Sequence, residues 1–279
     1  MVKQLTRPPA ERLFASASLA RASVFTYISI LFSIAFVLCS VHNLCMYRDP
    51  RGGHNRKVVN ENFFKIWSPQ MAYVLGFIFA DGAILDVRHS ARTCYIHLAN
   101  NDKSILEQMK SCLSSNHTIQ ARKPRIALFG EELFSCSESF HLRIGNKIMY
   151  DDLLNLGVTP RKSLTMVFPD IPTSFLSFFL RGYFDGDGNI YFGIVKDRRQ
   201  PRLRINFVSG SPKFLTYLGE KLKNVLQLNS FPFYKNSRAF RLSYSKHDSL
   251  KILRFMYREL DAAPYLERKY KVYQKVLKS

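Results

Sequence analysis

The sequence predicts an α+β fold made of two pseudo-symmetric repeats, each with the element order αββαββα. Three observations support this prediction. Residues 68–82 and 174–188 share an apolar pattern and an ending, and strand-like and helical segments follow both in the same order. Each copy also closes on an Arg-Lys dipeptide at nearly the same distance from its first helix. The repeats are expected to span about a hundred residues each.

The two opening segments read SPQMAYVLGFIFADG and SFLSFFLRGYFDGDG, and both indicate short apolar helices. Ser68, which precedes a proline, and Ser174, which follows Pro172, are predicted to cap the helix starts. Both segments end in Asp followed by Gly. Because Gly82 and Gly188 suit a chain that leaves a helix in an unusual backbone conformation, the helices are expected to end at the aspartates.

Strands and helices then follow in matching order in the two copies. In the first copy, strands are expected at 83–88, 93–99, 117–123 and 139–145, and helices at 102–113 and 147–157. In the second copy, strands are expected at 189–195, 202–209, 230–235 and 239–244, and helices at 211–226 and 248–260.

The basic dipeptides strengthen the case for a repeat. Lys162 lies 81 residues after Asp81, and Lys269 lies 82 residues after Asp187. This agreement is hard to obtain by chance in unrelated segments. The sequence therefore predicts four segments, listed by residue: a hydrophobic N-terminal extension (1–47), a polar basic lead-in (48–67), the first repeat (68–165) and the second repeat (166–279).

The N-terminal extension has no Lys, Arg, Asp or Glu between Ala22 and Tyr47, and its apolar run is long enough to cross a bilayer. Residues 22–47 are therefore a candidate membrane anchor. The alternative is that residues 1–45 do not belong to the working protein and that Met46 is the true start. Both explanations stay open, and with them a membrane location against a cytoplasmic or organellar one.

Charge and composition indicate the kind of partner. The 279 residues carry 41 Lys+Arg against 21 Asp+Glu, a formal net charge of +20, with 47% hydrophobic residues. That hydrophobic content excludes a disordered basic tail, and the charge favours a polyanion over a small neutral substrate. Residues 188–279 alone have a net charge of +14. The five cysteines have no CxxC spacing, which argues against a zinc site.

Small residues recur at a spacing of four on both opening helices. Gly76 and Ala80 lie on one face of the first helix, and Gly182 and Gly186 lie on one face of the second. Two such faces in contact bring the backbones close together. We expect these four residues to form the interface between the helices.

Asp81 and Asp187 would then project side by side from the ends of the paired helices. Neighbouring carboxylates repel each other unless a cation lies between them. Hard oxygen ligands favour Mg²⁺, or another divalent cation such as Mn²⁺. The spacing therefore predicts a metal site made by one aspartate from each repeat.

The strands predict curved antiparallel sheets with one buried and one polar face. Ile96, Leu98, Ile205 and Phe207 are expected in the core. Polar and basic residues of the other face and its loops are candidates for contacts with DNA bases and phosphates. These candidates are Arg88, Arg92, His97, Arg122, Lys123, Arg125, Arg143, Lys196, Arg198, Arg199, Arg202, Arg204, Asn206, Lys235, Arg238 and Arg241.

The motifs VLGFIFADG and LRGYFDGDG resemble two copies of the LAGLIDADG motif, and the chain resembles single-chain, two-motif LAGLIDADG homing endonucleases from about residue 60 onward. The segments VTPRKSLTMVFPDIP and YLERKYKVY also resemble parts of this family. The first motif departs from the family at Phe79, where the second copy has Asp185. Because this position serves packing or capping, the departure leaves the expected chemistry intact.

The resemblance implies a monomer whose paired LAGLIDADG helices lie between two sheets that form a DNA-binding saddle. It implies double-strand cleavage of a long, asymmetric DNA site across the minor groove. Metal binding would fall to Asp81 and Asp187, and assistance near the scissile phosphates to Lys162 and Lys269. The alternative is an intron maturase of the same family, which binds RNA to assist splicing.

Overall fold

The computed structural model describes residues 57–91, 93–129, 132–194, 201–229, 231–235 and 239–279, which belong to one compact unit, Lys57–Ser279. The candidate anchor at 22–47 and residues 48–56 of the predicted lead-in lie outside the described residues. Among the helices that are described, none combines the length and apolar character needed to cross a membrane.

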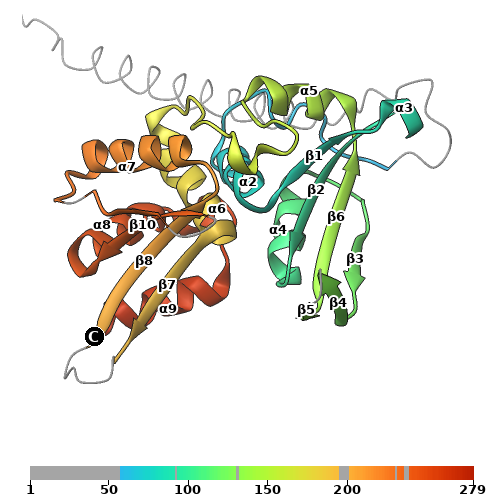
Figure 1. Ribbon diagram of the computed structural model, residues 1–279. Helices are drawn as coiled ribbons and strands as arrows, with labels where there is room; N and C mark the ends of the chain where they lie inside the picture. Colours follow the sequence, from blue (N-terminus) through green and yellow to red (C-terminus); the bar gives the residue numbers. More distant parts are fainter. Residues whose placement is uncertain (1–56, 92, 130–131, 195–200, 230, 236–238) are drawn as a thin grey trace, which may run out of the picture. The chain divides into compact units, whose positions relative to one another are not determined.

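The first half begins with helix α2 and continues into a four-stranded antiparallel sheet of order β1-β2-β6-β3. Helices α4 and α5 pack against this sheet (Figure 1). The bounds are α2 Pro69–Asp81, β1 Ala83–Asp86, β2 Cys94–Asn100, α4 Lys103–Cys112, β3 Ile119–Arg122, β6 Ser139–Gly145 and α5 Lys147–Asn155.

The second half repeats this arrangement, with helix α6 followed by a sheet of order β7-β8-β10-β9. Helices α7 and α8 pack against this sheet (Figure 1). The bounds are α6 Leu176–Asp187, β7 Gly188–Gly193, β8 Arg202–Ser209, α7 Pro212–Leu226, β9 Phe233–Lys235, β10 Phe240–Ser245 and α8 Lys246–Met256. The predicted α+β fold with matching element order is confirmed.

Several elements were not predicted. The connection from β3 to β6 contains a separate two-stranded hairpin, and a last helix follows α8. These elements are the hairpin strands β4 Arg125–Phe129 and β5 Glu132–Cys136, helices α3 Arg88–Ala91 and α9 Glu267–Leu277, and the 3₁₀ turns η1 Lys162–Leu164, η2 Thr173–Phe175 and η3 Leu260–Ala262.

The helix starts follow the predicted capping in one half only. The Ser68 hydroxyl accepts a hydrogen bond from the Met71 N–H at 3.1 Å, which satisfies a free donor at the start of α2. The prediction that Ser174 caps α6 is wrong. Ser174 lies inside η2, and α6 begins at Leu176 without a side-chain cap. The preceding 3₁₀ turn is closed by the Phe175 N–H donating to the Pro172 carbonyl, so the chain enters α6 from a turn that is already formed.

Both sheets have one buried and one more open face. Along β8 the burial alternates strictly, with Ile205 and Phe207 fully buried and Arg202, Arg204 and Asn206 partly exposed on the opposite face. On β2, Ile96 and Leu98 are likewise buried. The predicted core face of each sheet is confirmed.

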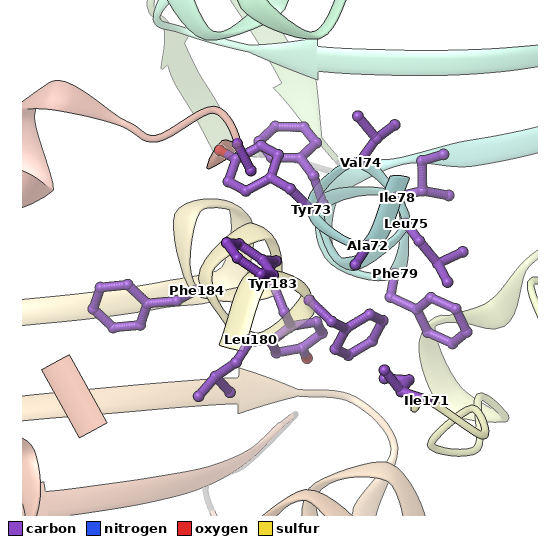
Figure 2. Packing of buried hydrophobic residues seen from close by; sticks show 14 of the residues in the cluster. Ala72, Tyr73, Val74, Leu75, Ile78, Phe79, Ile171, Leu180, Tyr183 and Phe184 are labelled. Atoms are coloured by element: carbon purple, nitrogen blue, oxygen red, sulfur yellow. The ribbon is translucent and has the colours of Figure 1, made fainter. Parts of the chain in front are cut away.

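The centre of the unit is the packing of α2 against α6, which is more extensive than that of any other pair of elements described. Figure 2 shows Val74 and Ile78 pointing from α2 away from α6, and Leu180 pointing from α6 away from α2. Each helix is therefore buried on its outer side as well, against its own half of the core. Phe79 has no exposed surface and stacks on the Phe214 ring with centroids 6.0 Å apart.

Candidate active site and nucleic-acid interface

The contact between α2 and α6 leaves no room for a side chain at two glycines. A Cβ atom on Gly76 would lie 2.0 Å from the Phe179 carbonyl oxygen, and one on Gly182 would lie 2.0 Å from the Tyr73 carbonyl oxygen. Further along, a Cβ on Gly186 would lie 2.4 Å from the Cβ of Ala80. The four small residues singled out in the sequence therefore lie where the two backbones meet.

This close contact brings the ends of the two helices together. Helix α2 ends at Asp81 and α6 ends at Asp187, and each is followed by a glycine that enters the first strand of its sheet. A Cβ on Gly186 would lie 3.4 Å from the Asp81 carboxyl carbon, so the second helix end directly faces the first aspartate.

The two carboxyl groups affect each other. Burial and the neighbouring Asp81 raise the pKa of Asp187 to about 6, although Lys162 and Lys269 oppose this shift. Burial also raises the pKa of Asp81 against the opposing effect of the same two lysines. The site therefore has an unfavourable concentration of negative charge that a cation would relieve.

Lys162 is buried beneath the first helix end, with 6% of its surface exposed. It begins η1, directly after Arg161 in a left-handed backbone conformation with φ of 56°. Its ammonium donates to the Gly82 carbonyl at 2.6 Å and to the Ala80 carbonyl at 3.4 Å. Burial lowers the pKa of Lys162, and Asp187 and Asp81 oppose that shift.

Lys269 occupies the matching place beneath the second helix end, with 3% of its surface exposed. It lies on α9, and its ammonium donates to the Gly188 carbonyl at 2.6 Å, to the Asp185 carbonyl at 3.0 Å and to the Phe184 carbonyl. Three acceptors engage all three N–H groups. Burial lowers the pKa of Lys269 to about 8.

Three further side chains near the second helix end, those of Asp185, Tyr73 and Arg181, were not predicted to belong to the site. The Asp185 carboxylate is fully buried and accepts from the Tyr73 hydroxyl at 2.7 Å and from the Leu266 N–H at 2.8 Å. Arg181 is also fully buried and donates to the Ala263 carbonyl at 2.9 Å. Charged residues at positions 181 and 185 of an otherwise apolar helix were the signal that could have revealed this network.

The open face of the first sheet carries aromatic and basic side chains. The Arg143 guanidinium lies 3.7 Å from the Tyr95 ring centroid, and the rings of His97 and His141 are stacked with centroids 5.2 Å apart. Arg122 ends β3 next to this group. Arg88 differs from its prediction on a strand or loop, because it begins the short helix α3 and forms an ion pair with Asp86.

The open face of the second sheet carries more arginines. Arg202, Arg204 and Asn206 alternate along β8, and the Arg241 guanidinium on β10 lies 5.6 Å from the Tyr234 ring centroid. The structure places the other described candidates at Lys123 between β3 and β4, Arg125 at the start of β4 and Lys235 at the end of β9. The remaining candidates, Arg92, Lys196, Arg198, Arg199 and Arg238, lie outside the described residues.

The donor set at the paired helix ends suits a hard divalent cation. Asp81 and Asp187 supply two carboxylates, and burial together with mutual repulsion disfavours their ionised forms. Mg²⁺ in proteins is commonly held by one or two carboxylates, with water and substrate phosphates as the other ligands. Within the described ranges there is no cluster of three or more His, Cys, Asp and Glu side chains that could hold a metal by itself.

Comparisons with known proteins find a family match for part of the chain and solved structures of similar fold. A family model described as LAGLIDADG endonuclease matches residues 180–279. The meganuclease I-SmaMI, solved bound to uncleaveable DNA, is 15% identical with a TM-score of 0.51, and the match covers 75% of this chain and 89% of that one. The homing endonuclease I-GzeII, solved with its DNA target, is 12% identical with a TM-score of 0.51, and the match covers 76% and 90%.

Among curated proteins, nothing matches this chain. At these low identities the solved structures establish the fold, while the family model identifies the second half from its sequence. The predicted resemblance is confirmed: residues 180–279 match the LAGLIDADG endonuclease family, and the described chain has the fold of single-chain LAGLIDADG meganucleases.

Proposed function

We propose that this chain is a site-specific double-strand DNA endonuclease of the homing type, acting as a monomer. The observation that carries the proposal is the meeting of Asp81 and Asp187 at the ends of α2 and α6, each with a buried lysine beneath its helix end. The helix pair thus brings one carboxylate from each half of a single chain to the same place. The solved proteins of the same fold are described with DNA.

In this proposal Asp81 and Asp187 hold the divalent cation, Mg²⁺ or Mn²⁺, together with phosphate oxygens of the DNA. When bound, the cation supplies Lewis-acid activation of water and stabilises charge on the leaving oxygen. The chain's own residues position these carboxylates, because the glycine contacts of α2 and α6 fix the distance between the helix ends.

Lys162 and Lys269 act from beneath the carboxylates. Each ammonium lies among carbonyl oxygens at a helix end, where it offsets the negative end of the helix dipole. The same positive charge favours ionised aspartates above it, as the opposing shifts in the aspartate pKa values indicate. The lysines are thus placed to balance charge that develops at the phosphates.

DNA would lie along the open faces of the two sheets. Arg202, Arg204 and Asn206 on β8 project from the partly exposed face of the second sheet, in the part of the chain with a net charge of +14. Arginine reads guanine edges and asparagine reads adenine edges in the major groove. The unequal charge of the two halves suits an asymmetric site.

The test incubates the purified full-length chain with a randomised plasmid library in Mg²⁺ and maps the ends of cut molecules. We expect cuts at one long sequence, with loss of cleavage on the order of 10³-fold in Asp81→Asn and in Asp187→Asn. DNA binding in EDTA should persist in both variants. The matched control is Asp170→Asn, which changes an exposed aspartate in the connection between the halves and should leave cleavage intact.

Two outcomes would overturn this function. Cleavage that survives both substitutions would remove the carboxylates from the reaction. Binding of folded intron RNA without any DNA cleavage would favour the maturase of the same family instead.

A further inference from the structure

The open face of the first sheet contains a chain of three hydrogen-bonding side chains that the proposed reaction does not use. His97 Nε2 lies 3.0 Å from His141 Nδ1, and His141 Nε2 lies 3.0 Å from the hydroxyl of Ser139. The two rings are stacked nearly parallel, at an interplanar angle of 6°. All three residues are partly exposed, so the ends of the chain reach the surface where DNA would lie.

Two arrangements of protons satisfy this chain equally well. In the first, Ser139 donates to His141 and His141 donates to His97, which leaves an N–H on His97 Nδ1. In the second, His97 donates to His141 and His141 donates to Ser139, which leaves a bare nitrogen at His97 Nδ1. No other described residue forms a hydrogen bond with that nitrogen.

The two arrangements interconvert with proton balance. One proton leaves His97 Nδ1 for water, the two protons shared along the chain each move by one place, and the Ser139 oxygen takes a proton from water. The outward nitrogen of His97 changes from donor to acceptor while no heavy atom has to move.

The surroundings keep both imidazoles neutral, which the exchange requires. Burial, His141, Arg122 and Arg143 lower the pKa of His97, and burial and Arg122 lower the pKa of His141. Arg122 comes from β3 and Arg143 from β6, and no acidic group contributes to either shift. Near neutral pH each ring therefore carries one proton and has one donor and one acceptor nitrogen.

We propose that Ser139, His141 and His97 form a reversible hydrogen-bond chain. This chain would let the first sheet accept any of the four bases at one position of the DNA that it contacts. This inference rests on the proposed function, since it concerns how the same enzyme recognises DNA. A donor at His97 pairs with the major-groove acceptors of guanine, thymine or adenine, and an acceptor pairs with the amino groups of adenine or cytosine.

Among the described residues of the second sheet there is no equivalent chain of hydrogen-bonded side chains. By the matching registers of the two sheets, His97 corresponds to Asn206 and His141 corresponds to Arg241. Arginine can only donate hydrogen bonds. The first sheet is therefore expected to tolerate different bases at this position, and the second sheet is expected to prefer particular bases at the equivalent position.

The experiment selects duplexes from a randomised library with the full-length chain in EDTA, so that bound DNA stays uncut. The His97→Arg variant locates the base pair, because an arginine there should introduce a guanine preference of about tenfold or more at the position it faces. At this position the original chain should accept all four bases with differences in Kd below about threefold.

The decisive variant is His141→Arg, which can only donate and so forces His97 Nε2 to accept. His97 Nδ1 then remains a donor, and the located position should become selective against cytosine, whose major-groove edge offers no acceptor, by about fivefold or more. The matched control is His247→Arg, which adds the same charge at an exposed residue on α8 and should leave the tolerance unchanged.

A second measurement needs no DNA. Long-range ¹⁵N spectra of the full-length chain should show averaged tautomers for His97 and His141 near pH 8. One fixed tautomer in both rings, or an unchanged base profile in His141→Arg, would overturn the proposal. Absence of any sequence-specific binding by the original chain would instead contradict the proposed function, so the two failures are distinguishable.

Discussion

The two motif helices, α2 and α6, pack against each other, but the buried side chains that hold each helix in place differ in their chemistry. On α2, Leu75 and Phe79 are apolar and fully buried. The corresponding positions on α6 are Arg181 and Asp185, which are also fully buried and carry charge. The buried charge of the helix pair is therefore carried by α6 alone, and α2 contacts it through the Tyr73 hydroxyl.

The buried charges serve a different purpose, because they bind the segment that carries the second lysine. Asp185 accepts from the Leu266 N–H, and the Leu266 carbonyl accepts from the Lys269 N–H at the start of α9. The segment after Lys162 is held instead at Met166, whose carbonyl accepts from the Ser211 hydroxyl at 2.7 Å. The two lysines thus occupy similar positions, although different contacts hold the segments that carry them.

The largest expected effect comes from removing the buried carboxylate of the second half. Asp185→Ala removes a buried negative charge that faces the positive charges of Lys269 and Arg181, and it removes the acceptor of Tyr73 and Leu266, so unfolding free energy should fall by about 3–5 kcal/mol. The corresponding change in the first half, Phe79→Leu, should cost about 1 kcal/mol. Urea unfolding measures both. Equal losses would mean that the two halves are held in the same way.

The next largest loss of unfolding free energy should be the same for a glycine change on α2 and for one on α6. In Gly76→Ala and in Gly182→Ala the new methyl group would meet a backbone carbonyl at 2.0 Å, and a backbone cannot move aside as a flexible side chain can. Each variant should lose about 2–3 kcal/mol of unfolding free energy.

The control for this pair is Gly193→Ala. Its added Cβ would meet only the Tyr191 side chain, at 3.2 Å or more, and should cost much less. A difference of more than about 1 kcal/mol between the Gly76 and Gly182 variants would show that the helix contact is itself asymmetric.

A smaller effect on stability depends on pH and should differ between Asp81 and Asp187. The folded protein raises the pKa of Asp187 to about 6 from 3.8, so without metal the folded state binds the proton more tightly than the unfolded state. Stability from this group is then present at low pH and falls as pH rises from about 4 to about 6.

Asp187→Asn should therefore stabilise the metal-free protein at pH 8, on the order of 1 kcal/mol, and by more than Asp81→Asn, because Asp81 has additional help from Arg268. Unfolding curves at pH 4.5 and pH 8 test this order. Mg²⁺ should stabilise the original chain at pH 8 and have little effect on Asp187→Asn.

The smallest effect concerns the DNA-facing charge. Replacing Arg202 and Arg204 by glutamine should weaken DNA binding more than replacing Arg88 and Arg92, because Arg88 already pairs with Asp86. Each lost phosphate contact should reduce the slope of log K against log salt by about 0.9. Equal slopes in the two double variants would place the phosphate contacts evenly over the halves.

The sequence predicted the features that repeat locally. Periodicity and spacing identified both motif helices, most strands of the sheets and the positions of Asp81 and Asp187 at helix ends. The hairpin of β4 and β5 was missed because the predicted strands at 117–123 and 139–145 left the residues between them without an assigned element. Helix α9 was missed because its segment is dominated by charged and aromatic residues rather than a simple apolar stripe.

Contacts between distant residues could not be predicted in detail. The hydrogen bond between Tyr73 and Asp185 joins residues 112 positions apart, and nothing in either local pattern specifies the partner. The pairing of His97 with His141 depends on the register of β2 against β6, and a slip of one residue would move the rings to opposite faces.

The long separation between each aspartate and its lysine also orders the events of folding. Lys162 and Lys269 reach the helix ends only after the intervening sheet of each repeat has formed, and long-range contacts of this kind form slowly. The two carboxylates come together only when α2 packs against α6. A chain that emerges from the ribosome and folds its first repeat early would carry a single acidic centre without its counterpart. In the proposed function, such a chain would lack the paired carboxylates needed to hold the cation.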